Sequence, residues 1–147
     1  MAIIVTGTPG TGKTTYAKTL AKKKHYTYVD VNEFAKEHNC VTGHDKQRDA
    51  SIVDEKRLAK ALDAFLAKNE NVVLDGHLSH VASPDLVESC IVTTCDLKEL
   101  RKRLEARGYS EQKIEENLQA EIMRVCEEEA QQAGHNIMLV STDPKGI

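Results

Sequence analysis

The segment from Gly7 to Thr14, GTPGTGKT, constrains the fold of this chain more than any other feature. It matches the phosphate-binding loop GxxxxGK[ST] at every specified position, directly after the apolar run Ala2 to Val5 and directly before a helical pattern. Glycines let backbone N–H groups turn toward a phosphate, while the helix N-terminus and the Lys13 ammonium add positive charge. Thr14 is placed to ligate Mg²⁺. A glycine turn with a chance Lys-Thr pair accounts poorly for so complete a match.

Short apolar runs alternate with helical patterns along the rest of the chain, which predicts an α/β fold with a parallel sheet and helices on both faces. Strands are predicted over residues 2–5, 26–29, 72–74, 90–92 and 137–140, and helices over 14–23, 31–38, from a cap at Asp54 through Phe65, 96–107 and 110–133. Gly108 is expected to end the helix before it in a left-handed cap. The segment 39–51 has many polar residues and no periodicity, so we expect an irregular, mobile surface excursion there.

Length and charge limit the kinds of protein to consider. The 147 residues fit one domain, 1–147, and 20 Lys and Arg against 23 Asp and Glu leave a net charge of -3, so direct binding to nucleic acid is not expected. The apolar runs are far shorter than the roughly 18 residues of a membrane span, and the first residues resemble neither a signal nor a transit peptide. We therefore expect an intracellular, cytoplasmic protein without membrane contact. The four cysteines form no CxxC pair, which predicts reduced and mostly buried thiols.

The run Val72 to Asp75 is an apolar strand that ends in an acid, at the place where such folds hold Mg²⁺ through water. Many parallel strands end in an aspartate that only hydrogen-bonds a loop, so this assignment depends on the phosphate-binding loop. His77 follows two residues later. Its imidazole could position a water or the loop over a terminal phosphate, and a loop histidine without a role is the alternative.

Three arginines, Arg101, Arg103 and Arg107, lie close together near the end of one predicted helix. Guanidinium groups stabilise the negative charge that spreads over a phosphate during its transfer, and they stack on adenine. One or two of the three are expected to act in this way. A solvated basic face accounts for Arg101 and Lys102. The segment 110–133 is rich in glutamate, and a run of this kind usually forms a solvated helix face.

Three segments resemble the adenylate kinase isoenzyme 6 family, whose archaeal and nuclear members are adenylate kinases and ATPases tied to small ribosomal subunit maturation. They are Gly7 to Thr15, the element Asp75-Gly76-His77, and the run Arg103 to Tyr109, RLEARGY, followed by residues 117–121. The likeness covers nearly the whole chain. The loop alone occurs in many NTPases, whereas the Asp-x-His and Arg-Gly-Tyr elements select this family.

The resemblance implies a P-loop NTPase fold of the nucleoside monophosphate kinase type, with a five-stranded parallel sheet, a monophosphate-binding region over about residues 30–53 and a short lid over about 106–116. Together with the motifs, it assigns nucleotide binding to Gly7, Gly10, Thr11, Gly12, Lys13, Thr14, Thr15, Arg103 and Arg107, Mg²⁺ to Thr14 and Asp75, and catalysis to Lys13, Asp75, His77 and Arg107. Two departures stand out. The sequence lacks the Phe-Pro-Arg that follows Asp75-Gly76 in ordinary adenylate kinases, and Lys36 stands where relatives often carry an arginine.

The activity that the resemblance implies is ATP + AMP ⇌ 2 ADP with Mg²⁺, accompanied by slow ATP hydrolysis. AMP and ADP would be its small-molecule partners and a small-subunit ribosomal protein its protein partner, with a nuclear location if the source is eukaryotic. Two alternatives remain open. One is an ATP-hydrolysing ribosome-assembly switch with little kinase activity, and the other is a small-molecule kinase whose region 30–53 recognises an acceptor other than AMP.

Overall fold

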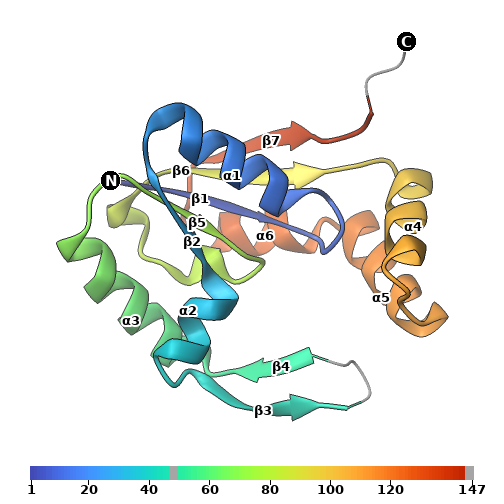
Figure 1. The fold of residues 1–147 in the computed structure, drawn as a ribbon, viewed down its shortest axis with the longest axis horizontal. Coiled ribbons are helices and arrows are strands. Elements are labelled where there is room, and N and C mark those ends of the chain that lie inside the picture. Colours follow the sequence, from blue (N-terminus) through green and yellow to red (C-terminus); the bar gives the residue numbers. More distant parts are fainter. Residues whose placement is uncertain (47–49, 145–147) are drawn as a thin grey trace.

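Five parallel strands form the central sheet of the protein in a computed structural model, which describes residues 1–46 and 50–144 (Figure 1). The strand order is β2 (Thr27–Asp30), β5 (Val72–Asp75), β1 (Ala2–Gly7), β6 (Val87–Thr94) and β7 (Ile137–Ser141). All four strand pairs in this sheet are parallel, which confirms the predicted sheet. Because β1 is the central strand, the phosphate-binding loop that follows it leaves the sheet at the middle of its carboxyl edge.

Helices cover both faces of this sheet, as predicted. They are α1 (Lys13–Lys24), α2 (Val31–Glu37), α3 (Glu55–Lys68), α4 (Leu97–Ala106), α5 (Glu111–Ile122) and α6 (Val125–Gln132), and two 3₁₀ turns, η1 (Ser79–Val81) and η2 (Pro84–Leu86), join β5 to β6. None of the helices in the described ranges is long and apolar enough to cross a membrane. The cysteines are free thiols, three of them buried and Cys126 half-buried, which confirms the expectation of mostly buried thiols.

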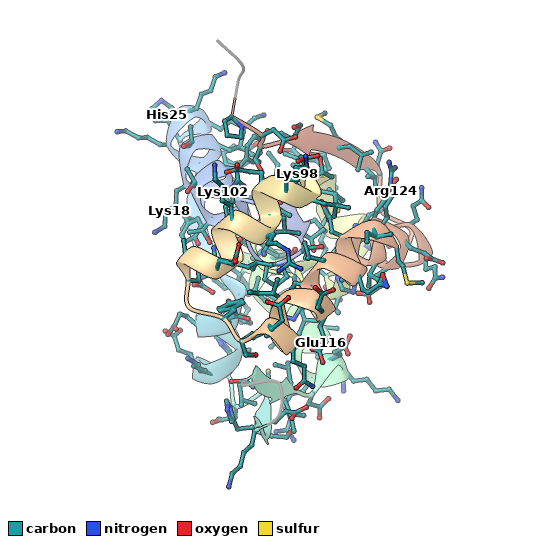
Figure 2. The ribbon with its side chains drawn as sticks, turned by 90° about the vertical axis from the view of Figure 1, so that its right-hand side faces the viewer. Lys18, His25, Lys98, Lys102, Glu116 and Arg124 are labelled. Carbon is teal, nitrogen blue, oxygen red and sulfur yellow. The ribbon has the colours of Figure 1, made fainter. Side chains whose placement is uncertain are left out.

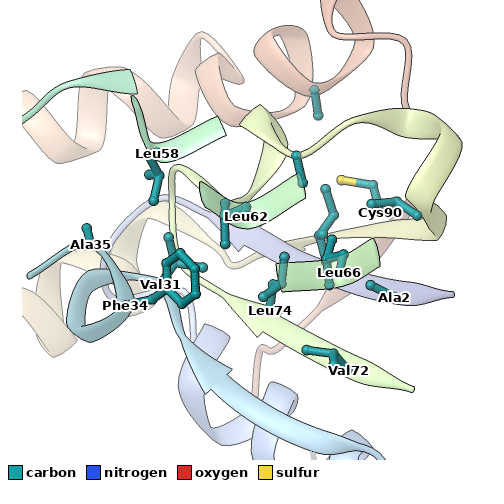
Figure 3. Packing of buried hydrophobic residues seen from close by; sticks show 14 of the residues in the cluster. Ala2, Val31, Phe34, Ala35, Leu58, Leu62, Leu66, Val72, Leu74 and Cys90 are labelled. Atoms are coloured by element: carbon teal, nitrogen blue, oxygen red, sulfur yellow. The ribbon is translucent and has the colours of Figure 1, made fainter. Parts of the chain in front are cut away.

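The period-two pattern of β1 divides the core between the two faces. Ile3 and Val5 pack with α1 on one side, whereas Ala2 and Ile4 belong to a larger cluster with α2, α3 and α6 on the other (Figure 3). The apolar positions of α3 supply Leu58, Leu62 and Leu66 to that larger cluster. A third cluster joins α4 to α5 beside the carboxyl edge of the sheet.

Local capping explains where the helices begin and end. Asp54 Oδ1 accepts a hydrogen bond of 3.1 Å from the Arg57 N–H at the start of α3, and Gly108 adopts a left-handed conformation, φ 75°, after α4, both as predicted. Helix α1 differs, because it begins at Gly12 with no side-chain cap from any residue that the structure describes. Its first N–H groups therefore face the loop and are available to a ligand.

The prediction of an irregular segment over 39–51 is wrong for the residues that the structure describes, and residues 47–49 lie outside them. An antiparallel hairpin occupies this region, with strands β3 (Val41–Asp45) and β4 (Ala50–Val53). At its base Val41 pairs with Val53, and both pack against the larger core cluster. Most of the remaining described hairpin is exposed, so its polar composition hides the strand pattern.

The prediction of one helix over 110–133 is also wrong, because α5 and α6 are separate helices. Arg124 adopts a left-handed conformation between them, with φ 53°. Helix α5 buries Ile114 and Leu118 against α4, whereas α6 buries Ala130 against the sheet, so the chain must change direction. The sequence gives no sign of this turn, since an arginine rather than a glycine or proline stands there.

Candidate active site

A cleft of about 640 Å³ opens at the carboxyl edge of the sheet. One wall consists of the phosphate-binding loop, the start of α1 and the end of β5. The facing wall comes from α2 and the β3–β4 hairpin, and the end of α4 with α5 and α6 closes the side. Open α/β sheets bind ligands at this edge, so the geometry marks the cleft as the candidate active site.

The phosphate-binding loop holds its shape through backbone conformations that favour glycine. Gly10 and Gly12 have φ of 92° and 84°, and a Cβ at Gly10 would stand 2.9 Å from Leu100 Cδ1. Both residues line the cleft, together with Lys13, Thr14 and Thr15.

Thr11 lies on the other side of the same loop. It is fully buried, and its hydroxyl donates a hydrogen bond of 2.6 Å to the Thr8 carbonyl oxygen. Neither Thr11 nor Gly7 is among the residues that line the cleft. The structure therefore gives these two residues a part in shaping the loop.

Lys13 and Asp75 place opposite charges in the floor of the cleft. Burial lowers the pKa of the Lys13 ammonium, the nearby Asp75 carboxylate opposes that shift, and Arg107 adds to it. Two cations, Arg107 and the half-buried Lys13, in one cleft suit a polyanion such as the phosphates of a nucleotide.

Asp75 has a buried carboxylate in which one oxygen accepts a hydrogen bond and the other does not. Its Oδ2 accepts a hydrogen bond of 2.5 Å from the Tyr28 hydroxyl, and Oδ1 has no partner among the described residues. Burial and this bond raise the pKa of Tyr28. A buried carboxylate oxygen without a partner is costly in a protein, which points to a ligand that supplies the missing contact.

The oxygen atoms at and near Asp75 are suited to binding Mg²⁺. No group of three His, Cys, Asp or Glu side chains gathers to hold a metal within residues 1–46 and 50–144. Mg²⁺ does not need such a group, because it retains waters and is commonly bound by one or two carboxylates and the phosphates of its substrate. The Thr14 hydroxyl and the free Asp75 oxygen provide hard oxygen ligands of this kind, and both residues line the cleft.

His77 lies at the surface of the cleft, just beyond the end of β5. Partial withdrawal from water in the cleft lowers the pKa of its imidazole, and the positive charges of Lys13 and His80 lower it further. The ring is therefore neutral at pH 7, and a neutral imidazole can accept a hydrogen bond from a water. Its backbone is fixed, because the Thr6 hydroxyl donates a bond of 3.2 Å to the His77 carbonyl oxygen.

The three arginines of α4 point to different surroundings. Arg107, at the end of α4, lines the cleft. Arg103 lies outside the cleft lining and donates to the Gly10 carbonyl oxygen at 3.2 Å and to the Thr142 carbonyl oxygen at 2.7 Å. Arg101 forms ion pairs with Glu111 and Glu115 of α5. Lys98 and Lys102 stand on the outward side of α4, in solvent (Figure 2).

Three further residues support the site although no role was predicted for any of them from the sequence. Tyr28 holds Asp75, as described above. The Thr142 hydroxyl donates a bond of 2.6 Å to the Thr11 carbonyl oxygen, which ties the loop to the chain after β7. Glu121 accepts from the Thr8 hydroxyl at 3.0 Å and from the Cys95 N–H at 3.1 Å. Polar residues at the carboxyl edge of a predicted sheet are the signal that could have drawn attention to Tyr28 and Thr142.

The wall opposite the loop carries a different set of side chains. Its lining residues are Asp30, Asn32, Lys36, Val41, Ser51 and Val53. Lys36 has an exposed ammonium that lies 3.6 Å from the Glu33 carboxylate. This wall combines a cation, the Asp30 carboxylate that caps α2, amide and hydroxyl groups and two apolar side chains, which is a composition suited to a polar molecule with a ring.

Comparison with curated proteins finds relatives along nearly the full chain. This chain is 40% identical over 146 residues to the adenylate kinase isoenzyme 6 homolog FAP7 of Saccharomyces cerevisiae, and the alignment covers 97% of this chain and 74% of that protein. The adenylate kinase isoenzyme 6 homolog of Schizosaccharomyces pombe is 37% identical over 131 residues, covering 89% of this chain and 74% of that protein. A family model described as an AAA domain matches residues 3–124.

Solved structures with the same fold include two kinases of low sequence identity. The shikimate kinase of Acinetobacter baumannii has a TM-score of 0.64 at 12% identity, with 99% of this chain and 84% of that chain covered. The shikimate kinase of Bacteroides thetaiotaomicron has a TM-score of 0.59 at 19% identity, with 95% and 86% covered. These similarities show the P-loop kinase fold.

Proposed function

The chain belongs to the adenylate kinase isoenzyme 6 family, and we propose that it catalyses ATP + AMP ⇌ 2 ADP with Mg²⁺. One observation carries this proposal. A single cleft has the phosphate-binding loop with Lys13 on one wall, and α2 with the β3–β4 hairpin on the other. Two nucleotides bound to these walls would face each other across the space above Lys13.

Catalysis in this arrangement depends on position and charge. The N–H groups of the loop and the Lys13 ammonium hold the β- and γ-phosphates, and Arg107 approaches the transferred group from the end of α4. A bound Mg²⁺, held by Thr14 and through water by Asp75, would neutralise charge on the phosphate oxygens. No general base is needed, because the phosphate of AMP is itself the nucleophile.

The acceptor wall supports a nucleoside monophosphate in this proposal. Lys36 supplies a point charge for the acceptor phosphate, without the two-pronged contact of an arginine. Asn32 and Ser51 offer polar contacts, and Val41 and Val53 offer an apolar surface for a base. A kinase for another small acceptor would use the same wall with different contacts.

Hydrolysis of ATP follows when water takes the place of the acceptor. His77 is the residue placed to orient that water, since its neutral ring lies at the cleft surface beside Lys13. In this proposal hydrolysis is slower than transfer, because one histidine positions a mobile water less firmly than a binding wall positions AMP.

A second candidate function, the ATP-hydrolysing assembly switch, draws support from a separate surface. A cavity of about 540 Å³ lies between α4, the end of α5 and β7. Leu97, Ile122 and Leu139 are exposed around it. The charged residues of the lining are Asp96, Glu121, Glu127 and Asp143 with Arg124, which forms an ion pair with Glu127, so the lining keeps an acidic excess. An apolar surface with acidic neighbours suits a basic protein partner, and the small-subunit ribosomal protein expected from the resemblance has that chemistry.

The decisive experiment is a coupled assay of ADP formation with ATP and each nucleoside monophosphate in turn. ATP alone is the control, because it measures hydrolysis. ADP formation that rises well above this control with AMP supports the kinase proposal. Equal rates with and without every monophosphate would contradict it and favour the switch, while a response to a different acceptor would identify another small-molecule kinase.

A further inference from the structure

A tyrosine from the edge strand β2 holds one of the two residues proposed to bind Mg²⁺. The Tyr28 hydroxyl donates a hydrogen bond of 2.5 Å to Asp75 Oδ2, and the Tyr28 ring packs in the core cluster on the α1 side of the sheet. The phenol therefore lies between α1 and the end of β5. We infer that Tyr28 is a positioning residue that orients the Asp75 carboxylate for Mg²⁺ and so sets the metal affinity of the site.

The strand register explains how the phenol reaches the carboxylate. Strands β2 and β5 pair in parallel, with Tyr28 opposite Val73 and Asp30 opposite Asp75. Since side chains two residues apart on a strand share a face, Val73 and Asp75 lie on the same side of β5. Tyr28 and Asp75 are therefore diagonal neighbours on the face that α1 covers, within reach of a long aromatic side chain.

The Tyr28 ring is held in place independently of its hydroxyl. It packs against the α1-side core cluster, which includes Val5 and Val73, and the Lys18 ammonium lies 5.4 Å from the ring centroid. Because packing fixes the ring, the position of the hydroxyl is set before any ligand binds. The hydroxyl can then hold a carboxylate that would otherwise rotate.

The hydrogen-bond pattern leaves the metal-facing atoms free. Tyr28 occupies Oδ2 of Asp75, while the buried Oδ1 is without a protein partner among the described residues. In the absence of the phenol, both carboxylate oxygens would lack a partner, and the group would be drawn toward Lys13, which is its nearby positive charge. The carboxylate would then be less available to Mg²⁺.

The inference rests on the proposed function in one respect, since it requires a Mg²⁺–nucleotide site. The test therefore measures binding and not turnover. The chain contains no tryptophan, so a ribose-labelled fluorescent ATP reports binding without interference. Its affinity is measured in EDTA and over a series of Mg²⁺ concentrations for the wild type and for Tyr28→Phe, which keeps the ring.

We expect Tyr28→Phe to raise the half-saturating Mg²⁺ concentration about tenfold or more, the scale seen when an outer partner of a metal ligand is removed. Affinity in EDTA should be unchanged. The control is Tyr26→Phe, which removes a hydroxyl that bonds Glu88 at the exposed end of the sheet, 3.1 Å away. That variant should match the wild type. In an Asp75→Asn background, Tyr28→Phe should have little further effect on Mg²⁺.

The outcomes separate the inference from the proposed function. If Mg²⁺ tightens ATP binding in the wild type and equally in folded Tyr28→Phe, the role of Tyr28 is overturned and the proposed function stands. The role of Tyr28 is also overturned, and the proposed function again stands, if Tyr28→Phe weakens Mg²⁺ binding as much in the Asp75→Asn background as in the wild type. If Mg²⁺ has no effect on wild-type binding, the proposed metal site fails, and the inference fails with it.

Discussion

The Thr8 hydroxyl donates a hydrogen bond of 3.0 Å to Glu121, a residue 113 positions further along the chain. The other Glu121 oxygen accepts from the Cys95 N–H, so one carboxylate joins the phosphate-binding loop, the start of α4 and the end of α5. Any movement of the end of α5 is therefore transmitted to the phosphate-binding loop.

Glu121→Gln tests this connection. The amide oxygen can accept from the Cys95 N–H and the amide NH₂ can donate to the Thr8 hydroxyl, so two charge-assisted bonds are replaced by weaker neutral ones and the loop is held less firmly. We expect the free energy of unfolding to fall by about 1 kcal/mol, and ATP affinity to fall with it. Chemical denaturation and nucleotide titration measure the two effects. Glu128→Gln, an exposed change on α6, is the control, and equal behaviour of the two variants would contradict the connection.

Lys13→Met is expected to abolish both phosphoryl transfer and ATP hydrolysis while the protein stays folded. Lys13 lines the cleft, and burial lowers the pKa of its ammonium, so the charge costs the folded state free energy instead of stabilising it. Activity assays and circular dichroism on the same sample check both parts. Full activity in a folded variant would overturn the assignment of the phosphate-binding loop.

Arg107→Ala should lower turnover by about 10³-fold, in line with other arginines that stabilise a transferred phosphoryl group. Arg101→Ala is the matched control, since it removes the same side chain from the same helix at a site paired with Glu111 and Glu115. We expect Arg101→Ala to leave kcat near that of the wild type. Steady-state kinetics at saturating ATP and AMP compare the two, and similar losses would argue against a direct role for Arg107.

His77→Gly separates the two reactions, because only hydrolysis needs an oriented water. We expect ATP hydrolysis to fall by roughly 10²-fold and AMP phosphorylation to fall less. His25→Gly serves as the control, since His25 has φ 60° at the end of α1, where glycine is well tolerated, and it does not line the cleft. Equal losses in both reactions would show that His77 maintains geometry common to both.

The pH dependence of His77 gives a further prediction. Its pKa in the folded, nucleotide-free protein should lie below the ordinary value of about 6.5, because the cleft walls, Lys13 and His80 all disfavour its charge. The unfolded chain then takes up this proton at a higher pH than the folded protein, so the contribution of His77 makes the free energy of unfolding fall as pH drops below about 6.5. NMR titration, assigned with His77→Gly, measures the pKa, and a value at or above 6.5 would contradict the prediction.

The sequence predicted those parts of the protein that local chemistry determines. The motif at Gly7 to Thr14, the cap at Asp54 and the left-handed Gly108 depend on residues close together in the chain. Tyr28, Glu121 and Thr142 depend on partners 47, 113 and 131 residues away, which no local pattern records. The turn at Arg124 was missed for a related reason, since the packing of α5 and α6 on different surfaces imposes it.

The β3–β4 hairpin meets the main core at its base, through Val41 and Val53, while Ile52 and Ser51 further along are exposed. Substitutions beyond the base therefore cost the sheet little stability, although Ser51 belongs to the lining of the cleft. The wall that carries the phosphate-binding loop has no such freedom, since its glycines and buried threonines are fixed by close contacts. If this wall binds the acceptor as proposed, Ser51 is the position at which evolution can alter acceptor contacts with the least cost to the core, whereas Val41 and Val53 are held by packing and Lys36 and Asn32 belong to α2.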